Sequence, residues 1–240
     1  PVSRKSYQRP AGLYETMLKC IVPYTIKGVL YYQGEEDWNK SYCYNVLNTL
    51  VINKWREAFE DKKLPFIITQ LPMFIDKGVE DDKNWCILRE QQELVAKNND
   101  NVGMVCLIDC GEYDNIHPVD KKTPGIRHGK QALGRVYKAI DKYDNMYFDS
   151  CEIKKDKMVV NFHNVYDDIL VKGDFIEGFE IAGADMNFTI AKAYVDNNTI
   201  VVWADTIIEP KYIRYAWTNY GKANVYNSEE LPLAPFRNYR

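Results

Sequence analysis

The 240-residue sequence predicts an α/β domain built on a parallel sheet, followed by a small antiparallel β-sandwich. Two contrasting patterns predict this fold. Short apolar runs alternate with amphipathic stretches over residues 1–143, whereas short β-type runs separated by turn residues fill residues 144–240. We therefore expect two domains, with their boundary at about residue 143.

In the first domain, apolar runs predict buried strands at 26–32, 65–71 and 103–109. Apolar residues at helical spacing predict helices at 41–60, 85–97 and 128–142. This alternation indicates a parallel sheet with right-handed crossovers. Three strand–helix units leave the edge beside 26–32 unpaired, so we expect one or more strands upstream of Pro1.

The second domain has no helical periodicity. Its expected strands include 158–162, 179–182, 191–195 and 200–203. Asp196-Asn197-Asn198 separates the last two of these runs, and such residues tolerate the left-handed conformation of a tight turn. The segment 191–203 is therefore predicted to form a β-hairpin.

The composition excludes several classes of function. The net charge is −3 without a basic stripe, so we expect no nucleic-acid partner. No apolar run reaches the roughly 18 residues of a membrane span, so we expect no membrane partner. The cysteines lie largely in apolar stretches and are expected to be free thiols, which favours the cytoplasm but leaves secretion open; they are Cys20, Cys43, Cys86, Cys106, Cys110 and Cys151.

The segment Asp114 to Pro118 follows the strand expected at 103–109, and loops at the carboxyl ends of parallel strands hold the sites of α/β sheets. Asp114 lies three residues before His117, so its carboxylate can fold back on one imidazole nitrogen and leave the other as a general base. The alternative is an ordinary loop with a surface histidine and a turn aspartate.

A second candidate loop, Tyr32 to Asp37, follows the strand at 26–32. Gly34 lets the backbone approach a ligand, and Gln33 offers an amide N–H to a developing oxyanion. Glu35 is a candidate to brace this substrate-binding loop. The alternative is a strand-to-helix loop whose acidic residues favour the N-terminus of the next helix.

Motifs along nearly the whole chain resemble the sialate O-acetylesterase family of SGNH hydrolases. In the first domain they are Leu13 to Met17, Pro23 to Val29, Tyr32 to Glu35, Trp55-Arg56, Pro65-Phe66, Gln70 to Pro72, Trp85, Arg89-Glu90, Gln92, Asp114 to Pro118, Gly125 and Arg127. In the second domain they are Gly178 to Gly183, Arg214 to Trp217, Leu231-Pro232 and Pro235 to Arg237.

The resemblance implies a three-layer SGNH or flavodoxin-like α/β domain with an associated β-domain. It implies a carboxylic ester hydrolase that removes O-acetyl groups from carbohydrates. We expect this serine mechanism to need no cofactor. By the same resemblance, His117 is the general base and Asp114 its orienting partner. Gln33 and Gly34 lie beside the oxyanion, with Glu35 in the same loop.

The sequence departs from the family at the nucleophile, because the family's Gly-Gln-Ser-Asn block is absent here. Its serines are Ser3, Ser6, Ser41, Ser150 and Ser228, and none lies in a predicted strand-to-helix elbow. We therefore expect the serine to come from an N-terminal fragment of the same protein, and this chain alone to be inactive. The alternative is a catalytically inactive carbohydrate-binding or structural fragment.

The remaining polar residues are expected to have structural or surface roles. Ser41 is expected to cap a helix, His128 to lie solvated at a helix start, and His163 to be structural. Asp109, Cys110, Glu112 and His117 fit no familiar zinc spacing, so no metal site is predicted. Arg89 and Arg127 are expected either to brace carboxylates near the site or to lie solvated on the surface.

Overall fold

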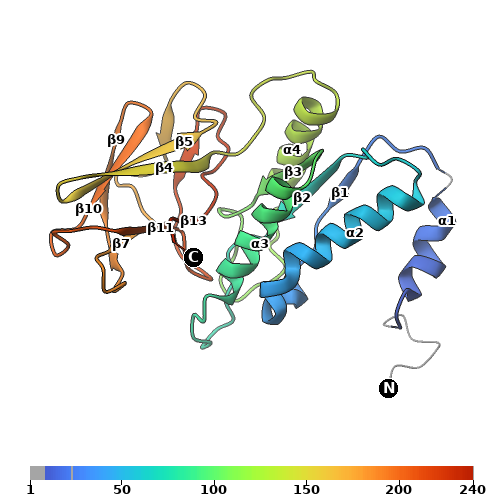
Figure 1. The fold of residues 1–240 in the computed structure, drawn as a ribbon, viewed down its shortest axis with the longest axis horizontal. Coiled ribbons are helices and arrows are strands. Elements are labelled where there is room, and N and C mark those ends of the chain that lie inside the picture. Colours follow the sequence, from blue (N-terminus) through green and yellow to red (C-terminus); the bar gives the residue numbers. More distant parts are fainter. Residues whose placement is uncertain (1–8, 23, 240) are drawn as a thin grey trace.

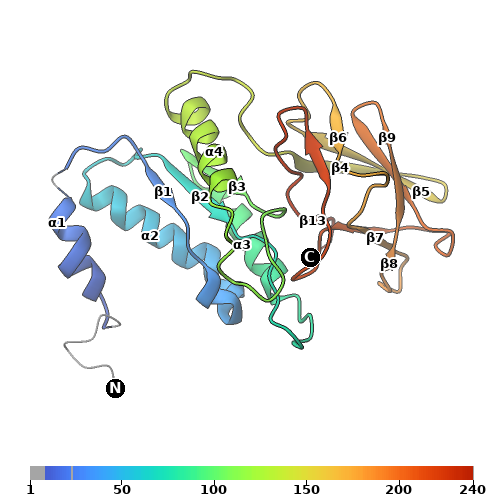
Figure 2. The same cartoon turned by 180° about the vertical axis from the view of Figure 1, so that it is seen from behind.

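The computed structural model describes residues 9–22 and 24–239. The chain folds into an α/β part and a β-rich part (Figures 1 and 2). The α/β part is built on three parallel strands in the order β1-β2-β3. They are β1 (Val29–Tyr31), β2 (Phe66–Gln70) and β3 (Val102–Cys106). Every residue of β2 and β3 is buried, which is typical of a parallel sheet covered on both faces.

Helices cover both faces of this sheet. Helices α2 (Tyr44–Ala58) and α3 (Asn84–Asn98) pack on the face that carries Phe66 and Ile68. The opposite face carries Ile67, which packs towards η3, a short π-helical segment (Ala132–Val136) that continues α4 (Lys122–Gln131). The predicted three-layer α/β architecture is confirmed.

Helix boundaries differ from the prediction at two places. The helix expected at 128–142 begins six residues earlier, because Asp120 accepts hydrogen bonds from the first backbone N–H groups of α4, and it ends before Lys138, whose φ is 54°. Ser41 caps no helix; it is buried in the 3-10 helix η2 (Glu35–Cys43), and Cys43 is the N-cap residue of α2. The N-terminal helices η1 (Tyr14–Leu18) and α1 (Lys19–Ile21) were not predicted.

The second part is antiparallel. One sheet has the order β4-β5-β10-β9, another β13-β11-β7-β8, and a short pair joins β12 to β6. The strands are β4 (Tyr147–Lys154), β5 (Lys157–His163), β6 (Ile169–Val171), β7 (Phe179–Ala182), β8 (Thr189–Ile190), β9 (Lys192–Asp196), β10 (Thr199–Trp203), β11 (Tyr212–Tyr215), β12 (Val225–Asn227) and β13 (Phe236–Arg237).

The predicted hairpin is confirmed, because β9 and β10 pair directly and Asn197 lies in the turn with a φ of 53°. Inward side chains of the two four-stranded sheets, such as Val160 and Ile181, belong to one hydrophobic core. That core continues into the α/β part and includes Leu88 of α3. The two parts therefore pack through a shared apolar interior.

Buried polar contacts reinforce the junction between the two parts. Arg89 of α3 is fully buried and donates to the backbone oxygen of Thr218, so it is not the solvated arginine of one expectation. Arg237 of β13 forms a two-point ion pair with Glu90, at 2.9 and 2.8 Å. None of the helices within the described ranges is both long and apolar enough to cross a membrane.

Candidate active site

The loops that follow β1, β2 and β3 emerge at one edge of the sheet, because the three strands are parallel. The side chain of Gln92 joins the first two loops. Its Oε1 accepts the N–H of Leu71 at 2.9 Å, and its Nε2 donates to the backbone oxygen of Gln33 at 3.2 Å. This buried amide on α3 fixes the loop after β1 against the loop after β2.

Gly34 occupies a position that only glycine fits without strain. Its φ is 145°, and a Cβ there would lie 2.8 Å from Nε2 of Gln92. The structure records no acceptor for the Gly34 N–H among the residues it describes, so this group is free to bind a ligand oxygen. The Gln33 side chain is engaged: its Nε2 donates to Asp37 at 2.6 Å, and its Oε1 accepts from Tyr44 at 3.1 Å.

The loop after β1 also approaches the loop after β3. Burial raises the pKa of Tyr32 to about 12, and the neighbouring side chains of Glu35 and Cys110 add to this shift. Burial and the neighbouring carboxylate of Asp109 raise the pKa of Cys110 to about 12 as well. The Cys110 thiol is therefore protonated at neutral pH and is a poor substitute for a nucleophilic serine.

The loop after β3 starts from a buried ion pair that sequence reasoning only partly anticipated. Arg127 of α4 donates to both oxygens of Asp109, at 2.6 and 2.7 Å, and to the backbone oxygen of Cys106 at 2.9 Å. The hydroxyl of Tyr226, from the β-domain, donates to the same carboxylate at 3.1 Å. Arg127 thus braces a carboxylate at the base of the candidate loop.

The electrostatics of this pair follow from the contacts. Burial alone would raise the pKa of Asp109, but the hydrogen bonds and charge of Arg127 hold it below its ordinary value. The side chains are only 6% exposed for Arg127 and 16% exposed for Asp109. Removal of either side chain would therefore leave the other charge buried and unpaired, which would destabilise the fold.

Asp114 and His117 lie in the same exposed turn but do not contact each other. Asp114 has a φ of 57°, and its Oδ1 accepts the backbone N–H of Lys77 at 2.8 Å. The backbone N–H of His117 donates to Asn115 Oδ1 at 3.0 Å, and the structure records no hydrogen bond between the imidazole and Asp114. The hydrogen bond that we expect between this histidine and this aspartate is therefore not formed in this conformation.

The rest of this loop is held by Glu112 and by close packing. Glu112 accepts from the side chain of Asn115 and from the N–H of Val119, both at 2.7 Å. A Cβ on Gly111 would lie 2.0 Å from the backbone oxygen of Met73. The loop after β3 therefore packs closely against the loop after β2 at Gly111.

The other two histidines are placed differently. His128, expected to be solvated, is buried, with Nε2 3.0 Å from Thr69 Oγ1 and Nδ1 2.8 Å from the Pro124 oxygen. The expectation failed because α4 begins at Lys122, so His128 lies inside the helix and faces Thr69 of β2. His163 lies on β5 beside Asp149, at 3.0 Å, on the exposed surface of the β-domain.

None of the serines that the structure describes lies in a loop that follows β1, β2 or β3 at the candidate edge of the sheet. Ser41 is buried in η2, while Ser150 and Ser228 belong to the β-domain. Ser3 and Ser6 lie outside the described residues. Within the described ranges, no three side chains of His, Cys, Asp or Glu gather as they would around a metal ion.

Sequence reasoning missed the contribution of the β-domain to this edge. Tyr226 reaches Asp109, Asn219 accepts the N–H of Phe74 at 2.8 Å, and Tyr220 contacts Tyr113. More than one hundred residues separate these partners along the chain, and no local pattern signals the contacts.

The fold and this edge define the class of protein: a three-layer α/β fold with its polar candidate residues at the carboxyl ends of parallel strands. A family model described as carbohydrate esterase, sialic acid-specific acetylesterase, matches residues 3–132. The chain belongs to this family of carbohydrate esterases.

Comparisons with individual proteins support this family assignment. The chain is 26% identical to sialate O-acetylesterases of Pongo abelii and Homo sapiens over 255 residues, which is 93% of this chain and 48% of each relative. It also resembles the crystal structure of a carbohydrate acetylesterase from Xanthomonas citri, with 31% identity and a TM-score of 0.88 over 95% of this chain and 54% of that protein. The chain thus spans about half the length of these relatives.

Proposed function

We propose that this chain forms the base-bearing half of a carbohydrate O-acetylesterase, with the serine supplied by a polypeptide segment upstream. The observation that carries the proposal is the family match over residues 3–132, which includes the loops of Gly34 and His117 at one sheet edge. The substrate class is an O-acetylated carbohydrate, as the names of the relatives imply.

In this mechanism, the serine oxygen attacks the acetyl carbonyl while His117 takes its proton. The sugar alcohol leaves with a proton from His117, and an acetyl-serine remains. His117 then takes a proton from water, which attacks the acetyl carbonyl; the bond to serine breaks, His117 returns the proton to the serine oxygen, and acetate is released. The N–H of Gly34 is the first candidate donor to the oxyanion. The side-chain amide of Gln33 is the second, through the N–H that it does not donate to Asp37.

Asp114 is assigned to orient His117, and this role requires a rearrangement of its turn. Its carboxylate accepts from Lys77 in the present conformation. Both side chains are exposed, so rotation towards each other displaces only solvent and one backbone contact. We place this rearrangement at the moment when the serine-bearing segment covers the edge.

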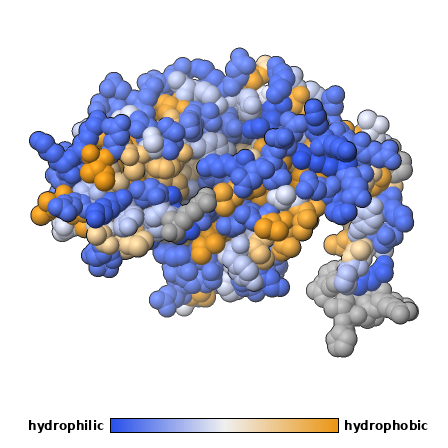
Figure 3. Space-filling model, viewed as in Figure 1, coloured by the Kyte–Doolittle hydropathy of each residue, from blue (hydrophilic) through white to orange (hydrophobic). Residues whose placement is uncertain are grey.

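The surface beside β1 supports the arrival of another segment. Leu30 is 60% exposed on the open face of β1, and the outward face of α2 exposes Val46, Leu47 and Leu50 by 60%, 49% and 54%. Figure 3 shows hydrophobic side chains gathered over the region of η2 and α2. Leu30 shares the sheet face of Ile67, opposite α2, so both sides of the β1 edge expose apolar side chains. Exposed apolar surface of this kind marks a protein interaction site.

The experiment compares acetate release from 4-nitrophenyl acetate and from an O-acetylated sugar. The samples are this chain, a protein in which the serine-bearing segment precedes Pro1, and that protein with His117→Ala. We expect no turnover by the chain, clear turnover by the completed protein, and a roughly 10⁴- to 10⁶-fold loss with His117→Ala.

His163→Ala is the matched control, because His163 is also an exposed histidine but lies on the β-domain. It should leave the rate unchanged. Full activity of the completed His117→Ala variant would refute the assignment of the base. Inertness of the completed protein on every acetyl ester would instead favour a carbohydrate-binding or structural fragment.

A further inference from the structure

Two tyrosines from different parts of the chain meet beside the candidate catalytic turn. Tyr113 immediately precedes Asp114, whereas Tyr220 belongs to the β-domain, after β11. Their ring centroids are 5.6 Å apart with an interplanar angle of 61°, an edge-to-face arrangement. Tyr113 is 52% exposed, so an aromatic surface lies open to solvent four residues from His117 along the loop.

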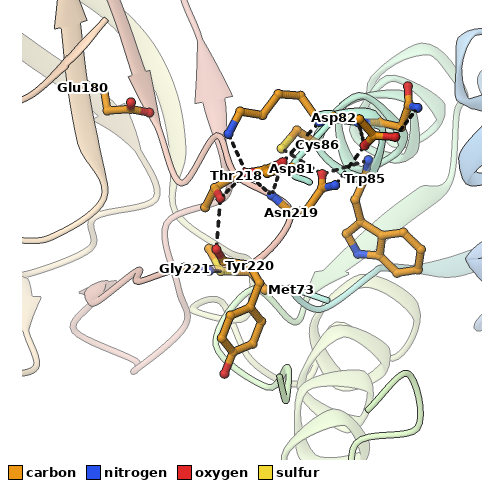
Figure 4. Close-up of polar contacts among 12 residues, drawn as sticks. Met73, Asp81, Asp82, Trp85, Cys86, Glu180, Thr218, Asn219, Tyr220 and Gly221 are labelled. Atoms are coloured by element: carbon orange, nitrogen blue, oxygen red, sulfur yellow. Dashed lines mark hydrogen bonds and ion pairs between the residues drawn. The ribbon is translucent and has the colours of Figure 1, made fainter. Parts of the chain in front are cut away.

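The backbone around Tyr220 is held on both sides. Thr218 donates its hydroxyl to Asp81 at 2.6 Å and lies 3.0 Å from the Tyr220 oxygen, and the Gly221 N–H contacts the sulfur of Met73 at 3.1 Å. Figure 4 shows the Tyr220 side chain pointing away from this polar cluster. The ring is therefore placed by a rigid support, and ordering it on ligand binding costs little entropy.

The hydroxyls of these two tyrosines have no recorded hydrogen-bond partner within the described part of the chain, unlike the hydroxyls of Tyr44 and Tyr226. No cation lies over either ring in the described ranges. The pair of Tyr194 and Trp203 on the β-domain differs, because the ammonium of Lys157 lies 4.9 Å from the Trp203 centroid. Of these two pairs, the pair of Tyr113 and Tyr220 offers both a ring face without a cation over it and hydroxyls without a recorded partner in the described residues.

A pyranose ring needs such a surface. Its C–H groups pack against an aromatic ring, and its hydroxyls exchange hydrogen bonds with phenolic oxygens. This contact also joins the β-domain to the loop of His117, and ligand sites occur preferentially at domain interfaces. We infer that Tyr113 and Tyr220 form a platform that binds the sugar ring of the substrate, which makes the β-domain part of the substrate site. This inference rests on the proposed function for the choice of ligand.

The first test needs only this chain, because binding does not require the serine. Saturation-transfer NMR and titration would use N-acetylneuraminic acid as the acidic probe and N-acetylglucosamine as the neutral probe. We expect saturation of sugar-ring protons from at least one probe, and Tyr113→Ala to weaken that binding about 5- to 10-fold. Tyr113→Phe keeps the ring and should weaken binding less than Tyr113→Ala.

Tyr137→Ala is the matched control, because Tyr137 is another exposed tyrosine, 58% exposed, at the far end of the helix that α4 begins. It should bind both sugars as the wild type does. Thermal unfolding of each variant separates lost binding from lost folding. Absence of saturation with both sugars, or unchanged binding by folded Tyr113→Ala, would overturn the platform.

A second arm uses the completed esterase and separates this inference from the proposed function. Tyr113→Ala should raise KM for the O-acetylated sugar about 5- to 10-fold and KM for ethyl acetate, which has neither a sugar nor an aromatic ring, much less. An unchanged KM for the sugar ester would overturn the platform even if the enzyme is active. Tyr113-dependent sugar binding by an inert protein would uphold the platform and refute the esterase.

Discussion

The two outer edges of the parallel sheet differ sharply. Beside β3, the side-chain amide of Asn145 takes the place of a neighbouring strand: its Oδ1 accepts the N–H of Cys106 at 3.2 Å, and its Nδ2 donates to the Met104 oxygen at 2.7 Å. Beside β1, the structure records no hydrogen bond to the outer backbone groups of Leu30 from any residue it describes.

The same contrast extends to the side chains that flank each edge. The β3 flank is covered by α4 and by the β-domain, and its polar groups are paired and buried (Figure 1). The β1 flank exposes apolar side chains on both the strand and α2. The difference indicates that the β3 flank is complete in this chain, whereas the β1 flank is suited to receive another polypeptide layer.

The largest expected effect tests the covered flank. Arg127→Ala leaves the carboxylate of Asp109 buried and without its cation, which should lower the free energy of unfolding by about 3–5 kcal/mol. Urea denaturation followed by circular dichroism measures this change. Lys54→Ala, which breaks the exposed pair with Glu57, should leave the stability almost unchanged. Equal effects of the two variants would remove the contrast between buried and exposed pairs.

A smaller effect concerns the pH dependence of the same flank. The pKa of Asp109 lies below its ordinary value in the folded protein, so its ionised form stabilises the fold above pH ~4. This contribution is lost as the pH falls from about 4 through the lowered folded pKa. Asp109→Asn removes the titrating group, and its stability should therefore fall less steeply below pH 4 than that of the wild type.

The measurement is the free energy of unfolding of both proteins from pH 2 to pH 8. Between pH 6 and pH 8 the carboxylate is ionised in both states, so Asp109 adds no slope and that range serves as the internal control. A wild-type curve that runs parallel to the Asp109→Asn curve below pH 4 would show that the ion pair does not control acid stability.

The sequence predicted the strands better than it predicted the side-chain contacts that cover the β3 flank. Apolar runs were enough to find β2 and β3, because strands buried on both faces lack polar residues. The unpaired edge of β1 was also expected. The caps on β3 were not, because Asn145 and Arg127 act through contacts with strand residues far away in the sequence.

Site prediction has the same limit. Position after a strand was enough to propose Gln33, Gly34 and His117 for the carboxyl edge. It gave no information on side-chain partners: Asp114 binds Lys77 instead of His117. Tyr220 carries no motif, and only the packing of the β-domain brings it to this edge.

The smallest expected effect tests the open flank. Leu50 on α2 is 54% exposed, and leucine and glutamine have similar helix propensities, so Leu50→Gln should change the free energy of unfolding of this chain by less than about 0.5 kcal/mol. Ile52 is two residues further along the same helix and fully buried; Ile52→Ala should cost about 2–5 kcal/mol because it leaves a cavity. Urea denaturation of the two variants provides the comparison. A loss above 1 kcal/mol with Leu50→Gln would mean that this face already contributes to the fold of the chain, and the β1 flank would then not be free to receive a partner.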